Sequence, residues 1–125
     1  MKTLLLEATE DSPFILFDPN KGHLKIQGRS LMVDASTYLK ILTDWLRTYI
    51  SNPQPLSILE IHLEHISTSS HSMLIYLLEE INKYYIMGHH FEVMWIYHTE
   101  DEYLKDVGEE LQEMFDVPIK ELALT

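Results

Sequence analysis

The sequence predicts an α/β domain with elements in the order ββαβαβαβ, on a mixed, mostly parallel sheet whose helices lie mainly on one face. Short runs with an apolar residue at every second position alternate with longer runs whose apolar residues recur every three or four positions. The predicted strands keep one polar side, which indicates a sheet with one face open to water. No linker or low-complexity tract divides the chain, so we expect a single domain over residues 1–125.

The first predicted elements are a β-hairpin and a helix. Pro13–Asp18 and Gly22–Gln27 read as two strands because the turn sequence Pro19-Asn20-Lys21-Gly22 lies between them. A helix from about Asp34 to Tyr49 follows, since its apolar residues have helical spacing. We expect this helix to end before the segment Asn52-Pro53-Gln54-Pro55, because proline cannot continue a helix.

The rest of the chain alternates strands with helices. Apolar and polar residues alternate over Leu56–Leu63, which predicts a strand, and a helical stripe starts near Ser70 and continues to Tyr84 or Tyr85. Gly88 follows at the position where a helix commonly ends with a residue of positive φ. The last predicted elements are a strand at Phe91–Tyr97, a helix at Asp101–Met114 and a strand at Ile119–Leu124.

Composition argues against several classes of protein. Nine Lys and Arg against twenty Asp and Glu give a net charge of −11, so we expect neither nucleic acid nor a membrane surface as partner. The absence of cysteine excludes disulfides and sulfur-ligated zinc, and without a glycine-rich phosphate loop we expect no cofactor. No segment has the roughly eighteen apolar residues of a membrane span, and the first residues do not form a signal peptide. We therefore expect a cytoplasmic protein.

Four hydroxylated residues in a row, Ser67, Thr68, Ser69 and Ser70, lie between a predicted strand and a predicted helix. A helix needs only one such oxygen at its N-cap. The run is therefore either redundant capping or a site that receives a phosphate, because anions and ligands bind at helix N-termini beyond the carboxyl ends of parallel strands. The residues alone favour capping and leave both interpretations open.

Two other kinds of site are weaker candidates. His62 and Glu64 lie two apart on one strand face and are possible metal ligands, although the sequence places no third ligand. They support an alternative function as a small-ligand or metal-binding sensor that uses the polar sheet face. An esterase-like site with Ser69 or Ser70 as nucleophile ranks last, because it lacks a placed base: in Ser70-His71-Ser72, neighbouring residues at a helix start point apart.

The order of elements and the hydroxyl-rich junction resemble a STAS-type domain, the fold of anti-sigma factor antagonists. The chain is more similar to the SiaC family of regulatory phosphoproteins, which are STAS-like and carry an Asn-Thr-Ser-Ser motif at this point. Thr68-Ser69-Ser70 reproduces three of these four letters, whereas Ser67 replaces the usual Asn. Leu31-Met32-Val33-Asp34 also departs from the Tyr-Pro-Glu-Asn of many members. Further agreement comes from Gly28-x-Ser30, Asp44-Trp45-Leu46, Tyr49, Trp95-x-Tyr97, Glu100-Asp101-Glu102, Leu104, Gly108-Glu109 and Pro118.

The resemblance implies a non-enzymatic binding protein that is switched by phosphorylation. It implies Thr68 as the phosphoacceptor, with Ser69 and Ser70 as secondary candidates, and a partner surface that includes Ser67, Thr68, Ser69, Ser70 and His71. The implied partners are a serine/threonine kinase, a PP2C-type phosphatase and an effector such as a diguanylate cyclase, which the unphosphorylated form binds. This would be partner switching in cyclic di-GMP signalling, with no catalytic residue on the chain itself.

Overall fold

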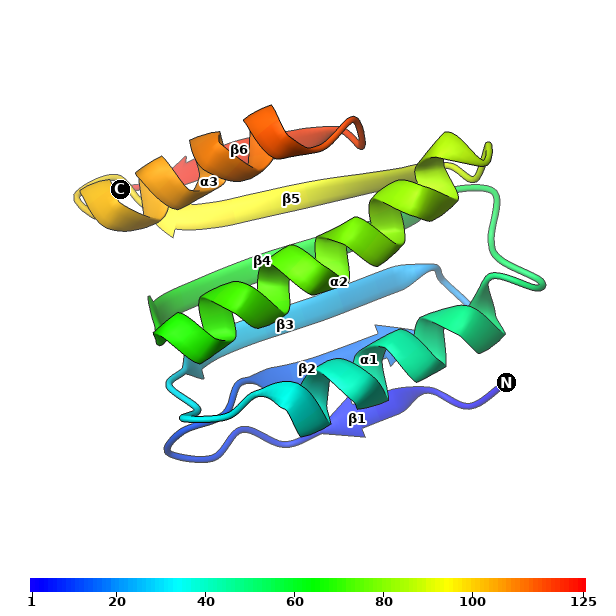
Figure 1. The fold of residues 1–125 in the computed structure, drawn as a ribbon, viewed down its shortest axis with the longest axis horizontal. Coiled ribbons are helices and arrows are strands. Elements are labelled where there is room, and N and C mark those ends of the chain that lie inside the picture. Colours follow the sequence, from blue (N-terminus) through cyan, green and yellow to red (C-terminus); the bar gives the residue numbers. More distant parts are fainter.

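A six-stranded sheet, with its strands in sequence order, forms the framework of the computed structural model, which describes residues 1–125 (Figure 1). Three helices complete the fold. The elements are β1 (Leu4–Leu6), β2 (Phe14–Asp18), β3 (His23–Ser30), α1 (Ser36–Tyr49), β4 (Ser57–Ile66), α2 (Thr68–Ile86), β5 (Phe91–His98), α3 (Glu102–Met114) and β6 (Ile119–Leu124).

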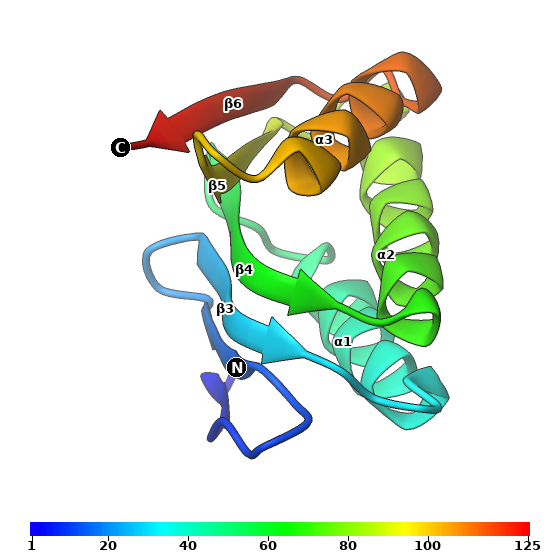
Figure 2. The same cartoon turned by 90° about the vertical axis from the view of Figure 1, so that its left-hand side faces the viewer.

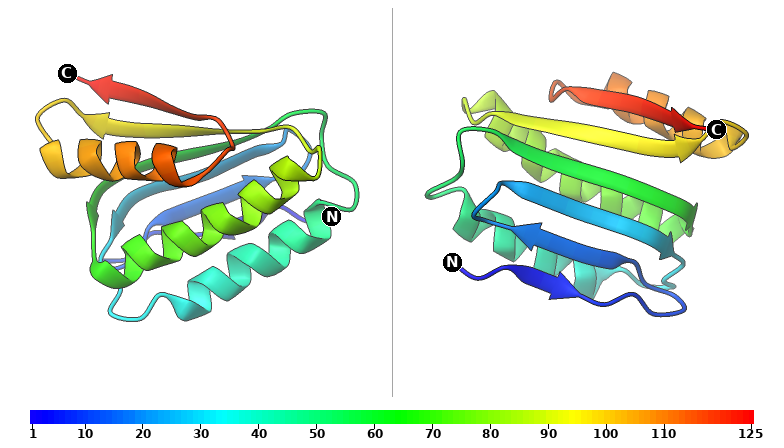
Figure 3. Two further views of the ribbon diagram at one scale, coloured as in Figure 1. Left: turned by 45° about the horizontal axis from the view of Figure 1, so that its top comes forward. Right: turned by 180° about the vertical axis from the view of Figure 1, so that it is seen from behind.

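The sheet is mixed. β1, β2 and β3 pair antiparallel, whereas β3, β4, β5 and β6 pair parallel, with one helix in each connection between parallel neighbours. All three helices cover the same face, and the other face is bare (Figures 2 and 3). The predicted mixed, mostly parallel sheet with helices on one face is therefore confirmed.

Two differences from the sequence prediction concern β1 and β4. β3 and α2 differ as well: β3 runs on to Ser30, past its predicted end at Gln27, and α2 starts at Thr68, before its predicted start near Ser70. β1 was not predicted, because three leucines without a turn signal are too short a pattern; it pairs Leu4 with Phe17, so the order is βββαβαβαβ. β4 runs on to Ile66, past its predicted end at Leu63. A bulge explains this second difference: Arg29 pairs with His65, Glu64 is skipped, and two successive exposed residues break the alternation.

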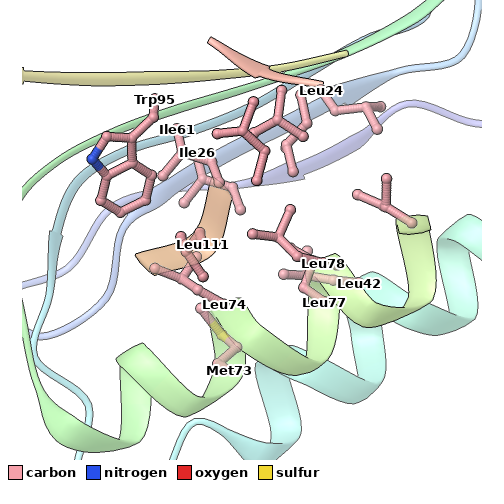
Figure 4. Packing of buried hydrophobic residues seen from close by; sticks show 14 of the residues in the cluster. Leu24, Ile26, Leu42, Ile61, Met73, Leu74, Leu77, Leu78, Trp95 and Leu111 are labelled. Carbon is pink, nitrogen blue, oxygen red and sulfur yellow. The ribbon is translucent and has the colours of Figure 1, made fainter. Parts of the chain in front are cut away.

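The hydrophobic core lies between the sheet and the helices and contains 27 buried residues. Strand residues contribute every second side chain, and α2, the central helix, contributes the most buried helical face. Burial of each such large side chain is worth about 1.5–3 kcal/mol. Figure 4 shows α2 side chains directed toward the sheet, with residues from α1 and α3 beside them; those labelled include Ile26, Ile61, Leu42, Leu74, Leu77, Leu78, Trp95 and Leu111.

The start of α2 determines where the hydroxyl run lies in the fold. Only Ser67 separates β4 from α2, so the helix starts directly at the carboxyl end of a central strand. At the other end, Gly88 has the positive φ, 106°, that was expected of it. None of the three helices has the length and apolar character needed to cross a membrane.

Candidate functional site

Ser67 is the N-cap of α2. Its hydroxyl accepts a hydrogen bond from the backbone N–H of Ser70 over 3.1 Å, and it donates to the carbonyl of Met32 over 2.7 Å. The backbone of Ser67 is extended, with φ −81° and ψ 168°, as N-caps require. One residue therefore supplies the side-chain cap of this helix.

Ser69 serves the neighbouring helix. The N-cap of α1 is Ala35, which has no side chain able to cap, and the hydroxyl of Ser69 accepts the backbone N–H of Ala35 over 2.7 Å. The half-buried Ser69 thus fixes the segment that enters α1.

Ser70 is fully buried, with 0 % of its surface exposed. Its oxygen accepts a hydrogen bond of 2.6 Å from the hydroxyl of Ser30, which is equally buried at the end of β3, and lies 3.0 Å from the hydroxyl of Ser67. The oxygen of Ser70 is out of reach of a kinase or a partner in the folded protein. Burial thus makes Ser70 a poor candidate for phosphoacceptor and for partner contact.

Thr68 differs from its three neighbours. It is the first residue of α2, it is exposed, and its hydroxyl forms no hydrogen bond within the protein. The first turn of α2 contains no acidic residue, so the positive end of the helix dipole is not neutralised there. Thr68 therefore presents an accessible hydroxyl at a position that favours negative charge.

His71 lies one turn into α2 and faces α3. Its side chain is 24 % exposed, and its Nε2 lies 3.6 Å from Oε1 of Glu110. No hydrogen bond joins this imidazole to Ser69 or Ser70, whose hydroxyls are engaged as described. The nucleophile–base pair that an esterase-like site needs is not formed.

The proposed metal ligands are not brought together into a site. His62 points to the bare sheet face, where its ring centroid is 6.1 Å from that of His98, and its Nε2 has no hydrogen-bond partner. Glu64 is the exposed residue skipped by the bulge. No group of three or more His, Cys, Asp or Glu side chains could hold a metal ion.

A hollow of about 540 Å³ lies at the carboxyl ends of β3 and β4, where α2 and α3 begin. Arg29 lines it without any ion-pair partner, and Tyr103, more than half exposed, borders it. The other lining residues are Leu31, Glu64, His65, Ile66, Asp101 and Leu104. Sequence reasoning did not select Arg29 or Tyr103, and it named Ser30 only as part of the family resemblance, because only the fold brings these distant positions to the start of α2.

Three comparisons relate the chain to known proteins. Residues 6–124 match the family described as SiaC family regulatory phosphoprotein. The crystal structure of apo-SiaC from Pseudomonas aeruginosa is 22% identical, with a TM-score of 0.87 over 98% of this chain and 100% of that one. SiaC in the crystal structure of the diguanylate cyclase SiaD with its activator SiaC, from the same species, is 23% identical, with a TM-score of 0.89 over 97% and 99%.

A curated relative, the uncharacterized protein PA14_02130 of Pseudomonas aeruginosa strain UCBPP-PA14, is 24% identical over 118 residues, which are 94% of each chain. The solved structures establish the fold, and the family match extends over nearly the whole sequence. The chain therefore belongs to the SiaC family of regulatory phosphoproteins.

Proposed function

We propose that this protein is a non-enzymatic cytoplasmic regulator that binds an effector, such as a diguanylate cyclase, while Thr68 is unmodified. A serine/threonine kinase would end this binding by phosphorylating Thr68, and a PP2C-type phosphatase would restore it. One observation carries the proposal: Thr68 is the only hydroxyl of its run that is exposed and has no structural partner. Family membership supports it, as does the complex of SiaC with a diguanylate cyclase in Pseudomonas aeruginosa.

The fold is expected to tolerate the phosphate. Phosphorylation adds about 1.5–2 negative charges and three acceptor oxygens. At the first residue of α2 these meet free backbone N–H groups and a dipole that no acidic side chain neutralises, an interaction worth about 0.3–2 kcal/mol. Modification at Thr68 therefore breaks no existing hydrogen bond and favours the helix.

An interface over the same surface would not tolerate it. A partner that covers Thr68 must remove water from a doubly charged group, which costs several kcal/mol unless a matching cation is supplied. Each 1.4 kcal/mol is tenfold in affinity, so binding is expected to weaken by a factor on the order of a hundred or more. This difference between the fold and the interface is what makes Thr68 a switch.

Exposed apolar side chains surround the start of α2 and are suited to contact the effector. Val33 is 98 % exposed in the loop before α1, and Tyr76 and Tyr103 are each 56 % exposed on α2 and α3. Tyr76 shares a hollow with Ser69, and Tyr103 shares one with Ile66. The remaining predicted contacts are half-buried, and we expect them to contribute mainly by shaping the surface that the effector contacts; they are Ser67, Ser69 and His71.

Calorimetric titration with a purified diguanylate cyclase from the same genome tests this function. Unmodified protein and Thr68→Ala are expected to bind with the same affinity, whereas phosphorylated protein and Thr68→Asp bind at least a hundredfold more weakly. Asn20→Asp is the matched control, because it adds the same charge at an exposed position in the turn before β3, at the opposite end of that strand from Ser30. Equal affinity of the phosphorylated and unmodified proteins would contradict the proposal.

A further inference from the structure

We propose that His71 positions the phosphate of phosphorylated Thr68 and links it to Glu110 on α3, an inference that rests on the proposed phosphorylation. It goes beyond that function by naming the side chain that holds the phosphate. The observation behind it is an imidazole with one buried nitrogen facing a carboxylate and a second nitrogen that is free.

His71 lies on the same side of α2 as Thr68. Residues three apart in a helix are surface neighbours, and helical side chains lean toward the N-terminus, so the imidazole leans over the turn that contains Thr68. Asn82 lies within about 20° of His71 around the helix axis. Its Oδ1 accepts the backbone N–H groups of Asp116 and Val117, just after α3, so this side of α2 faces α3.

The two ring nitrogens of His71 have different surroundings. Nε2 is buried, forms no hydrogen bond and lies 3.6 Å from Oε1 of Glu110. Nδ1 forms no hydrogen bond either, but it is accessible to solvent. A protonated imidazole donates from both nitrogens. In that form it can pair with the carboxylate of Glu110 through Nε2 and donate a hydrogen bond through Nδ1 to a phosphate oxygen on Thr68.

The negative charge of the facing helix α3 favours such a bridge. α3 is acidic, with Lys105 as its only basic residue. A phosphate on Thr68 would face this helix, and the first turn of α2 contains no Lys or Arg. Arg29 and His65 also lie near this end of α2, where they line the hollow at the ends of β3 and β4, but His71 is the group that faces Glu110. The acidic residues of α3 are Glu102, Asp106, Glu109, Glu110 and Glu113.

The test installs phosphothreonine at position 68 by genetic code expansion and follows the phosphate by ³¹P NMR as a function of pH. The second pKa of a phosphothreonine is about 6, and a neighbouring cation lowers it. We expect His71→Gln to raise the titration midpoint by roughly half a unit or more. His71→Lys, which places a permanent cation at this position, is expected to restore the lower midpoint.

His90→Gln is the matched control, because His90 is exposed beyond the far end of α2. Circular dichroism establishes that each variant is folded. Identical midpoints for the unsubstituted protein and His71→Gln would overturn the role of His71, and so would an equal change in His90→Gln.

Effector affinity separates this inference from the proposed function. If His71→Gln leaves the phosphate titration unchanged while phosphorylation still prevents binding of the diguanylate cyclase, the positioning role fails and the switch stands. If His71 shifts the titration but the phosphorylated protein binds the cyclase as tightly as the unmodified one, the switch fails and the pairing stands.

Discussion

Alanine substitutions along the hydroxyl run show which of the four hydroxyls stabilise the fold. A single measurement, the free energy of unfolding, distinguishes them. Ser67→Ala removes the bond to the N–H of Ser70 and the bond to the carbonyl of Met32. Loss of an N-cap costs about 0.5–2 kcal/mol, and the second bond adds about 0.5–1.5 kcal/mol. We therefore expect the free energy of unfolding to fall by about 1–3.5 kcal/mol in Ser67→Ala.

Thr68→Ala is expected to behave in the opposite way. Its hydroxyl makes no hydrogen bond within the protein, and alanine is the better helix former by roughly 0.5 kcal/mol. Ser70→Ala leaves the buried hydroxyl of Ser30 without its acceptor, which costs about 1–3 kcal/mol. Thr68→Ala alone should thus match or exceed the unsubstituted protein in stability.

Urea denaturation followed by circular dichroism measures these differences, and thermal melts give an independent value. For a chain of this size, 1 kcal/mol corresponds to a change in Tm of about 3–6 °C. If Thr68→Ala were destabilised as much as Ser67→Ala, the hydroxyl of Thr68 would have a structural role and the reasoning would be refuted. Equal stability of all the variants would refute the hydrogen-bond assignments.

Three further predictions concern other parts of the chain. Gly108→Ala should lower the free energy of unfolding by about 1–3 kcal/mol, because the added Cβ would lie 2.5 Å from Cδ1 of the buried Trp95. This clash is expected to outweigh the higher helix propensity of alanine. An unchanged or higher Tm in a thermal melt would show that the surroundings of Gly108 relax to accept the methyl group. Burial would raise the pKa of Glu80, but hydrogen bonds from Tyr84 and two basic side chains outweigh it and lower that pKa. The resulting stability is present above the ordinary glutamate pKa and is lost as the pH falls through the folded value, so Glu80→Gln should be less stable at pH 7 and the gap should close in acid. A gap independent of pH in urea titrations would contradict this. Calorimetry with Zn²⁺ should give no binding heat, and heat that disappears in His62→Ala would instead favour the sensor hypothesis.

Local patterns predicted most of the elements because each has a periodicity of its own. The boundaries of β6 were predicted to the residue, and α3 begins one residue later than expected because Asp101 is its cap, accepting the N–H of Leu104. β1 could not be predicted, since its place in the sheet comes from pairing with β2 and not from its three leucines. The end of β4 was missed because a bulge hides the alternation on which strand prediction depends.

The candidate site was predicted in part. Spacing placed the hydroxyl run at the junction of a strand and a helix, but it could not show which oxygens are engaged. Ser70 meets Ser30 across 40 residues of chain, and Ser69 meets Ala35 across 34. These partners are defined by the parallel pairing of β3 with β4, which no local pattern encodes.

The loop before α1 is held through its main chain. Met32 offers its carbonyl to Ser67, Ala35 offers its N–H to Ser69, and Leu31 donates its N–H to the carbonyl of Asp11. The exposed side chains of Val33 and Asp34 can therefore change while the loop keeps its shape, whereas Met32 is buried in the core. The exposed surface of this loop can thus vary in chemistry without any change in the hydrogen bonds that tie its backbone to the starts of α1 and α2.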